Sequence, residues 1–133
     1  MEKVFVDTSA LYALVSTRDD DHERAVTLWD SLAQSYRPLI TNNYALAECF
    51  ALVQNRLGLD FVRYLQYEVV PSLEIAWIDE EQHEAAINHV LSANRRNLSL
   101  VDCASFETMH AMEIDTVFTF DEHFREQGFN VIP

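Results

Sequence analysis

The stretch VFVDTS (residues 4–9) decides how the rest of the chain is interpreted. Val4, Phe5 and Val6 are β-branched or aromatic, a pattern that is typical of a short strand buried on both faces. We therefore expect a strand over residues 4–6 that ends at Asp7. A carboxylate directly after a buried strand is a poor choice for packing, because burial of an unpaired charge is unfavourable. Asp7 is thus the first candidate for a functional residue.

Short apolar runs alternate with longer amphipathic segments along the remainder of the chain. This alternation indicates βαβ units and a parallel sheet covered by helices, in which ligands bind beyond the carboxyl ends of the strands. No repeat or linker interrupts the 133 residues, so we expect one domain over residues 1–133. Further strands are expected at 38–40, 73–78, 115–120 and 129–132, and helices at 9–15, 21–36, 43–57, 60–70, from Asp79 to the loop at 94–97, at 99–113 and at 121–127.

Three residue counts exclude large classes of function. Only Gly58 and Gly128 are glycine, so the chain has no glycine-rich phosphate loop. Lys3 is the only lysine, which leaves almost no candidate for Schiff-base chemistry or lysine-assisted phosphoryl transfer. Cys49 and Cys103 form no CxxC motif, so neither a zinc ribbon nor a thioredoxin motif fits.

The chain is strongly acidic, with 22 Asp and Glu against 9 Lys and Arg and a formal net charge of -13 at pH 7. Because like charges repel, broad non-specific binding to DNA or to a membrane surface is disfavoured. No apolar run approaches the roughly 20 residues that a membrane span needs. The apolar run before Asp7 is too short for a signal peptide, and we expect a cytoplasmic protein without membrane contact.

Four acids differ from the others because their neighbours along the chain are apolar: Asp7, Glu48, Asp102 and Asp121. A lone buried carboxylate is unfavourable or has a raised pKa, and the basic residues are too few to pair with all of them. A bound Mg²⁺ or Mn²⁺ ion would resolve this, since both prefer hard oxygen ligands. Structural roles stay open for three of the four acids. Asp102 could be the acid of a capping box begun by Ser99, Asp121 could cap a helix, and Glu48 could face solvent.

Four segments carry a family resemblance: VDTSALYAL (6–14), NNYALAE (42–48), LSLVDCAS (98–105) and VFTFDEHF (117–124). In this order they resemble the PIN domain family, and within it the VapC-type toxins. The resemblance covers nearly the whole chain. It implies a three-layer α/β/α, Rossmann-like fold with a central, mostly parallel sheet. It also implies an endoribonuclease that depends on Mg²⁺ or Mn²⁺.

The resemblance also implies roles for individual residues. The four acids form one metal-binding pocket, with Asp7 and Asp102 as the primary ligands. Thr8 or Ser9, together with Thr119, match positions whose hydroxyls help to hold ligands or water. Many VapC-type proteins have Asn at the position of the fourth acid, so this chain departs from their pattern there. The expected reaction is in-line attack of metal-activated water on an RNA phosphodiester, which leaves 5′-phosphate and 3′-hydroxyl ends.

Partners follow from the same resemblance: a homodimer, and a small antitoxin whose C-terminal segment lies across the pocket and places Arg among the acids. Two alternatives stay open, a non-catalytic PIN-like binding module and a housekeeping PIN nuclease without an antitoxin. A receiver-like phosphoacceptor domain is disfavoured, because it needs a lysine late in the chain and none follows Lys3.

Few basic residues are available to contact RNA. Arg95 and Arg96 form the only adjacent basic pair and precede the helix of Asp102, so we expect them to contact RNA phosphates, although an exposed loop pair has the same pattern. The five histidines show no metal-ligand spacing, and His123 is singled out only by its closeness to the fourth acid. Weaker candidates for RNA contact are Arg18, Arg56 and Arg63.

Overall fold

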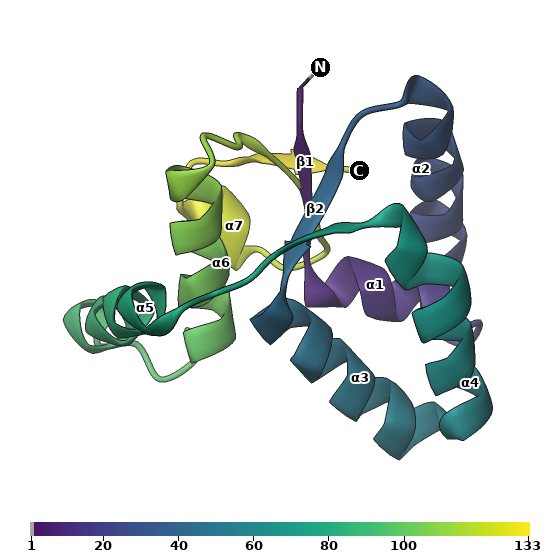
Figure 1. The fold of residues 1–133 in the computed structure, drawn as a ribbon, viewed down its shortest axis with the longest axis horizontal. Helices are drawn as coiled ribbons and strands as arrows, with labels where there is room; N and C mark the ends of the chain where they lie inside the picture. Colours follow the sequence, from purple (N-terminus) through teal and green to yellow (C-terminus); the bar gives the residue numbers. More distant parts are fainter. Residues whose placement is uncertain (1) are drawn as a thin grey trace.

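A computed structural model describes residues 2–133 and has a five-stranded sheet at its centre (Figure 1). Every strand pairing is parallel, and the strands lie in the order β3-β2-β1-β4-β5. This order places β1 in the middle of the sheet, between β2 and β4. The strands are β1 Val4–Val6, β2 Leu39–Asn42, β3 Glu74–Ala76, β4 Thr116–Phe118 and β5 Asn130–Ile132.

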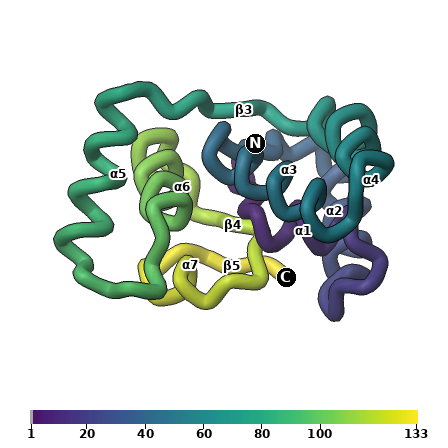
Figure 2. The backbone as a smooth tube through the Cα atoms, turned by 90° about the horizontal axis from the view of Figure 1, so that it is seen from below, coloured from purple at the N-terminus to yellow at the C-terminus, as the bar shows by residue number. Residues whose placement is uncertain are grey.

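Helices cover both faces of the sheet. Successive side chains of a strand point to opposite faces, so Val4 and Val6 enter one hydrophobic core and Phe5 enters the other. The first core packs the sheet against α1 to α4, and the second packs it against α5 to α7 (Figures 1 and 2). The predicted three-layer α/β/α fold is therefore confirmed. The helices are α1 Thr8–Val15, α2 His22–Ser35, α3 Asn43–Leu57, α4 Leu59–Tyr64, α5 Glu80–Ala93, α6 Leu100–Ala111 and α7 His123–Glu126.

The carboxyl ends of β1 and β4 are level with each other. Val6 is the register partner of Phe118, and the backbone N–H of Asp7 donates to the carbonyl oxygen of Phe118 (3.0 Å). Asp7 and Thr119 are the residues that follow these two adjacent strands, and they therefore lie side by side. The sheet thus presents the first predicted acid and a predicted hydroxyl residue at one edge.

Most helices begin and end at the polar residues that the sequence indicates. The Asn42 side chain accepts from Ala45 N and begins α3, and Gly58, with φ of 91°, ends it. Asp79 and Gln82 form a capping box at the start of α5. These local interactions set where each helix starts, and so they also set the orientation of its first turn.

Two strands are shorter than expected, because backbone N–H groups near their ends donate to side chains instead of to a neighbouring strand. The strand expected over 115–120 is only Thr116–Phe118, since the N–H of Phe120 donates to Ser9 Oγ (2.9 Å) instead of to a strand. The strand expected over 73–78 stops at Ala76, and the N–H of Ile78 donates to Asn43 Oδ1 (2.7 Å).

Two expected helices are shortened as well. The one expected over 121–127 begins at His123, because Asp121 Oδ1 accepts from His123 N (2.9 Å) in a turn. The one expected over 60–70 is α4, followed by a wider helical turn at Leu65–Val69 and a tighter one at Val70–Ser72. Within the described residues, no helix is both long and apolar enough to cross a membrane.

Candidate active site

A cleft of about 360 Å³ opens beside the carboxyl ends of β1 and β4, and the four acids all line it. They come from four separate segments of the chain: the end of β1, the middle of α3, the first turn of α6 and the loop after β4. The structure therefore brings together the predicted set, although no two of its members are closer than 19 residues in sequence. The other lining residues are Thr8, Ser9, Tyr12, Asp19, Asp21, Leu52, Arg56 and Phe120.

Asp7 is the most buried of the four acids, with only 4% of its surface exposed. It is the N-cap residue of α1, and its Oδ2 accepts from Ser9 N (3.4 Å), Ser9 Oγ (3.0 Å) and Thr119 Oγ1 (2.9 Å). Burial raises the pKa of Asp7 to about 6, and the nearby charges of Asp102 and Asp121 add to the rise, while the bonds from Thr119 and Ser9 oppose it. The pocket thus disfavours the ionised form of Asp7 when no cation is present.

Ser9 and Thr119 join the ends of the two strands around Asp7. Their hydroxyl oxygens lie 3.0 Å apart, and Thr119 Oγ1 also accepts from the backbone N–H of Asp121 (3.0 Å). Thr8 behaves differently, because its hydroxyl donates to the carbonyl oxygen of Ala45 in α3 (3.2 Å). The sequence left open whether Thr8 or Ser9 supplies the hydroxyl beside Asp7, and in the structure Ser9 supplies it.

Glu48 and Asp102 enter the cleft from helices on opposite faces of the sheet. Glu48 is half-buried, and burial raises its pKa, with the charges of Asp102 and Asp121 adding to the rise and the Thr8 side chain opposing it. Asp102 completes a capping box with Ser99 at the start of α6. Asp102 therefore has the structural role left open above and also lines the cleft, whereas Glu48 does not simply face solvent.

His123 lies beside two of the acids. Its Nδ1 is 3.2 Å from Asp102 Oδ2 and 3.3 Å from Asp121 Oδ1. Among the described residues, these three side chains form the group whose ligand atoms lie close enough together to hold one metal ion. The only sequence signal for His123 is its separation of two residues from Asp121.

Sequence reasoning missed three of the lining residues that carry polar groups: Tyr12, Asp19 and Asp21. Asp19 and Asp21 come from the loop before α2, where neither periodicity nor an apolar neighbourhood sets them apart from other surface acids. Tyr12 carries no sequence signal that links it to the four acids. Its ring lies under the guanidinium of Arg56, at 5.4 Å from the ring centroid, and Arg56 is the only basic residue that lines the cleft.

Other predicted residues lie outside this cleft. Arg95 and Arg96 are exposed in the loop after α5, and Arg95 forms an ion pair with Glu126 (2.8 Å). Neither lines the cleft, and contact of this pair with RNA stays a prediction. Cys49 and Cys103 are buried free thiols, and burial raises the pKa of Cys49 to about 12, so it stays protonated.

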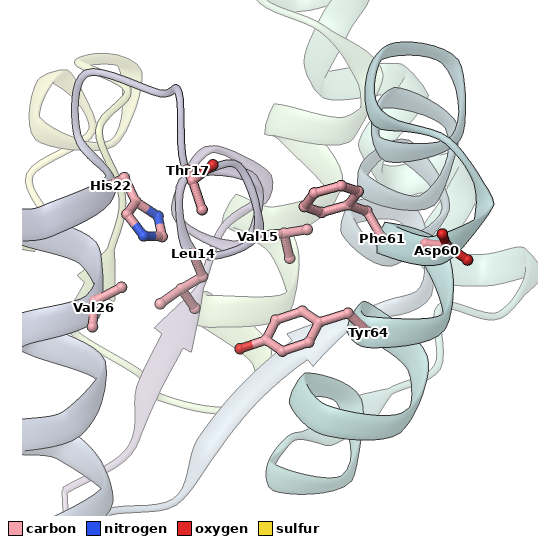
Figure 3. A pocket seen from close by; sticks show the side chains of 8 residues that line it. All are labelled: Leu14, Val15, Thr17, His22, Val26, Asp60, Phe61 and Tyr64. Carbon is pink, nitrogen blue, oxygen red and sulfur yellow. The ribbon is translucent and has the colours of Figure 1, made fainter.

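A second hollow lies between α1, α2 and α4 and has a different character (Figure 3). Its volume is about 420 Å³, and apolar side chains such as Leu14, Val26 and Phe61 dominate its wall. Although it is the larger hollow, none of the four acids lines it. All four predicted acids therefore lie in the acidic cleft and not in this apolar hollow.

Comparison with known proteins identifies the class to which this fold and cleft belong. Residues 4–130 match the PIN domain family, so the chain belongs to that family. It is 28% identical over 127 residues to the 23S rRNA-specific endonuclease VapC20 of Mycobacterium tuberculosis (strain ATCC 25618 / H37Rv), a match that covers 95% of both chains. The predicted family is confirmed, and the predicted nuclease class agrees with the endonuclease named here.

Solved structures show the same fold. The crystal structure of the Sarcin-Ricin loop cleaving toxin VapC20 from Mycobacterium tuberculosis has a TM-score of 0.85 at 27% identity, covering 98% of this chain and 100% of that one. FitAcB from Neisseria gonorrhoeae has a TM-score of 0.71 at 18% identity, covering 98% of this chain and 96% of that one. VapBC from Salmonella typhimurium, solved bound to DNA, has a TM-score of 0.67 at 15% identity, covering 98% and 97%.

Proposed function

We propose that the protein is a metal-dependent endoribonuclease and the toxin of a VapBC-type toxin–antitoxin pair. The observation that carries this proposal is the meeting of Asp7, Glu48, Asp102 and Asp121 in one cleft at the carboxyl edge of a parallel sheet. The relative with 28% identity is named as an endonuclease of 23S rRNA, which supports RNA as the class of substrate.

The chemistry of the donor set fits a divalent cation. Six carboxylates line the cleft, the four acids together with Asp19 and Asp21, and Arg56 is the single basic residue beside them. Clustered carboxylates are hard oxygen donors, which suit Mg²⁺ or Mn²⁺ better than softer metals. Burial raises the pKa of Asp7, and no basic side chain offsets that rise.

The four acids would hold the cation, with Asp7 and Asp102 as primary ligands and Glu48 and Asp121 completing the site. A divalent cation supplies the Lewis acidity that activates water and offsets the charge that develops on the phosphate. Ser9 and Thr119 hold the Asp7 carboxylate in place through its Oδ2. Their bonds keep this ligand in one orientation before any substrate binds.

Binding of the RNA backbone needs positive charge near the acids. Arg56 lines the cleft from α3, forms no ion pair among the described residues, and is therefore available to a phosphate oxygen. Arg95 and Arg96 would contact the strand further from the cleft. Since Arg95 is already paired with Glu126, an RNA phosphate would have to displace that carboxylate.

Partners follow from the toxins that share the fold. VapBC from Salmonella typhimurium and FitAB share the fold, and each was solved bound to DNA. We therefore propose a small antitoxin that neutralises this protein by placing Arg among the acids, because bidentate Arg–carboxylate pairs are strong. A homodimer and a cytoplasmic location belong to the same proposal.

Metal-binding calorimetry and RNA cleavage of Asp102→Asn test the proposal together. We expect Mn²⁺ binding to weaken strongly and cleavage of ribosomal RNA to fall about 100-fold or more, as when a transition-state contact is removed. The matched control is Asp30→Asn, an exposed aspartate of α2 that should leave both properties unchanged. A wild-type protein that folds but binds no Mn²⁺ would favour the non-catalytic binding module instead.

A further inference from the structure

We propose that His123 is a positioning residue of the acidic cleft. Its Nδ1–H bridges Asp102 and Asp121 and so leaves the opposite oxygen of each carboxylate to face a divalent cation. This inference rests on the proposed metal-dependent nuclease and extends it, because the family resemblance assigns His123 no role.

The hydrogen of the bridge follows from the chemistry of its partners. Nδ1 of His123 faces Asp102 Oδ2 at 3.2 Å and Asp121 Oδ1 at 3.3 Å. An ionised carboxylate accepts hydrogen bonds and does not donate them, so Nδ1 must carry the hydrogen. An imidazole carries this hydrogen in one of its neutral tautomers and in its charged form alike.

The backbone around His123 holds the ring where it is. The N–H of His123 donates to Asp121 Oδ1 (2.9 Å), which fixes the start of α7 against the loop. The next residue, Phe124, is fully buried, and its ring centroid lies 5.0 Å from that of Phe106 in α6, the helix that carries Asp102. The packing of α7 on α6 therefore sets the distance between His123 and Asp102.

The bridge determines which carboxylate oxygens remain available. Asp102 Oδ2 accepts from Ser99 N (3.1 Å) and from His123 Nδ1, while Asp121 Oδ1 accepts from the backbone N–H of His123 and lies 3.3 Å from its ring Nδ1. Asp7 follows the same pattern, because its bonds from Ser9 and Thr119 all reach Oδ2.

Each aspartate consequently has one oxygen held by the protein and one without a protein donor. Among residues 2–133, no side chain or backbone group donates to Asp7 Oδ1, Asp102 Oδ1 or Asp121 Oδ2. Each of these aspartates would thus offer a cation one oxygen that the protein leaves free. This arrangement suits Mg²⁺ and Mn²⁺, which take octahedral geometry and keep several waters.

Direct coordination of the cation by His123 is the opposing arrangement, since the three side chains lie close enough together to hold one ion. Coordination through Nδ1 would require that atom to lose its hydrogen and give up both contacts. It would also favour Mn²⁺ over Mg²⁺, because imidazole is not a usual ligand of Mg²⁺. The two arrangements therefore predict different behaviour for variants of His123.

Three variants at this position separate a positioning role from simple packing. An Asn side chain places its amide nitrogen near the position of Nδ1, whereas Gln places it near Nε2 and Ala removes the donor. We expect the Kd for Mn²⁺, measured by calorimetry, to rise about 10-fold or more in His123→Ala and His123→Gln, the usual effect of losing an outer contact to a metal ligand. His123→Asn should stay within about 3-fold of the wild type, since the donor is restored.

His110→Ala, at an exposed histidine of α6, serves as the control and should bind Mn²⁺ as the wild type does. Equal affinity in His123→Ala and the wild type would overturn the positioning role alone. A wild-type protein without any Mn²⁺ binding would overturn the proposed function as well. If His123→Ala fails to fold, the comparison of Asn with Gln carries the test.

Pulsed electron paramagnetic resonance of bound Mn²⁺ distinguishes the two arrangements directly. In protein labelled with ¹⁵N-histidine, a positioning residue predicts no coupling from a coordinated nitrogen. A coordinated-nitrogen coupling that disappears in His123→Asn would overturn the proposal and assign His123 as a ligand.

Discussion

Asp7 is the residue on which the electrostatics of the cleft depend most. It is buried at the end of the central strand, and its closest donors are neutral hydroxyl and amide groups. These bonds lower the pKa of Asp7, but burial outweighs them and the pKa rises to about 6. The ionised carboxylate therefore opposes folding until a cation binds.

The first prediction concerns the stability of Asp7→Asn without metal. A raised pKa in the folded state stabilises the protein below the unfolded value of 3.8, and this contribution is lost as the pH rises through about 6. At pH 8 the ionised carboxylate costs up to about 3 kcal/mol, which Asn avoids while its Oδ1 still accepts from Ser9 and Thr119.

Urea unfolding in EDTA measures this effect. Asp7→Asn should be more stable than the wild type at pH 8, and the gap should narrow to about half at pH 5 and close only below the unfolded pKa of 3.8. Asp30→Asn, at an exposed position of α2, should show no such change. A less stable Asp7→Asn at pH 8 would mean that the carboxylate is stabilised by a partner within the fold.

The second prediction concerns the pH dependence of metal binding. Protons compete with the cation for Asp7, so Mn²⁺ affinity should fall as the pH drops through about 6, well above the range in which an ordinary aspartate titrates. The rise in melting temperature caused by Mn²⁺ should be large at pH 7.5 and small at pH 5. A metal-induced rise that is the same at both pH values would contradict the raised pKa of Asp7.

At the scale of elements, the cleft depends on how α3 and α6 meet the sheet. Asn42 ends β2, and its Oδ1 caps α3 by accepting from Ala45 N (2.8 Å). Its Nδ2 donates to Ser105 Oγ (3.3 Å) and Thr108 Oγ1 (3.1 Å) of α6. One buried amide thus joins the helix of Glu48 to the helix of Asp102.

Asn42→Ala removes both links, and we predict a loss of about 2–4 kcal/mol in the free energy of unfolding. Asn42→Asp keeps the cap but loses the two donated bonds, so its loss should be intermediate unless the buried charge makes it larger. Denaturant unfolding measures both variants, with Asn88→Ala at an exposed site of α5 as the control. A loss no greater than that of the control would show that Asn42 does not hold the two helices together.

The sequence predicts an element well where interactions between residues close in sequence determine its ends. Caps at Asn42, Asp79 and Ser99 mark helix starts because each satisfies backbone N–H groups nearby. The end of β4 was predicted too far along, because Ser9, 111 residues away, binds the Phe120 N–H. His123 was not assigned to the site for a similar reason, since its link to Asp102 depends on the packing of α7 on α6.

At the scale of the whole molecule, the acidic surface and the metal-free acidic cleft both oppose RNA binding. With a formal net charge of -13, the protein repels RNA until a cation offsets the cleft, and Arg56 is the nearest positive charge. We therefore expect weak RNA binding without metal and a small number of phosphate contacts.

Arg56→Ala should weaken RNA binding uniformly across sequences and reduce the slope of log K against log salt by about one. Fluorescence anisotropy over a salt series measures this slope. The control is Arg37→Ala, an arginine that pairs with Glu2 and lies outside the cleft. The double variant Arg95→Ala, Arg96→Ala tests the predicted second contact. An unaltered slope in Arg56→Ala would exclude Arg56 from the phosphate path.

The most direct test of the central claim, that the four acids hold the cation with which this cleft cuts RNA, is a cleavage assay with mapping of the product ends. Wild type and Asp7→Asn are compared on single-stranded and ribosomal RNA with Mg²⁺, Mn²⁺ or EDTA. We expect the wild type to cleave only with metal and to leave 5′-phosphate and 3′-hydroxyl ends, and Asp7→Asn to lose cleavage. Undiminished cleavage by folded Asp7→Asn, or cleavage that persists in EDTA, would contradict the account.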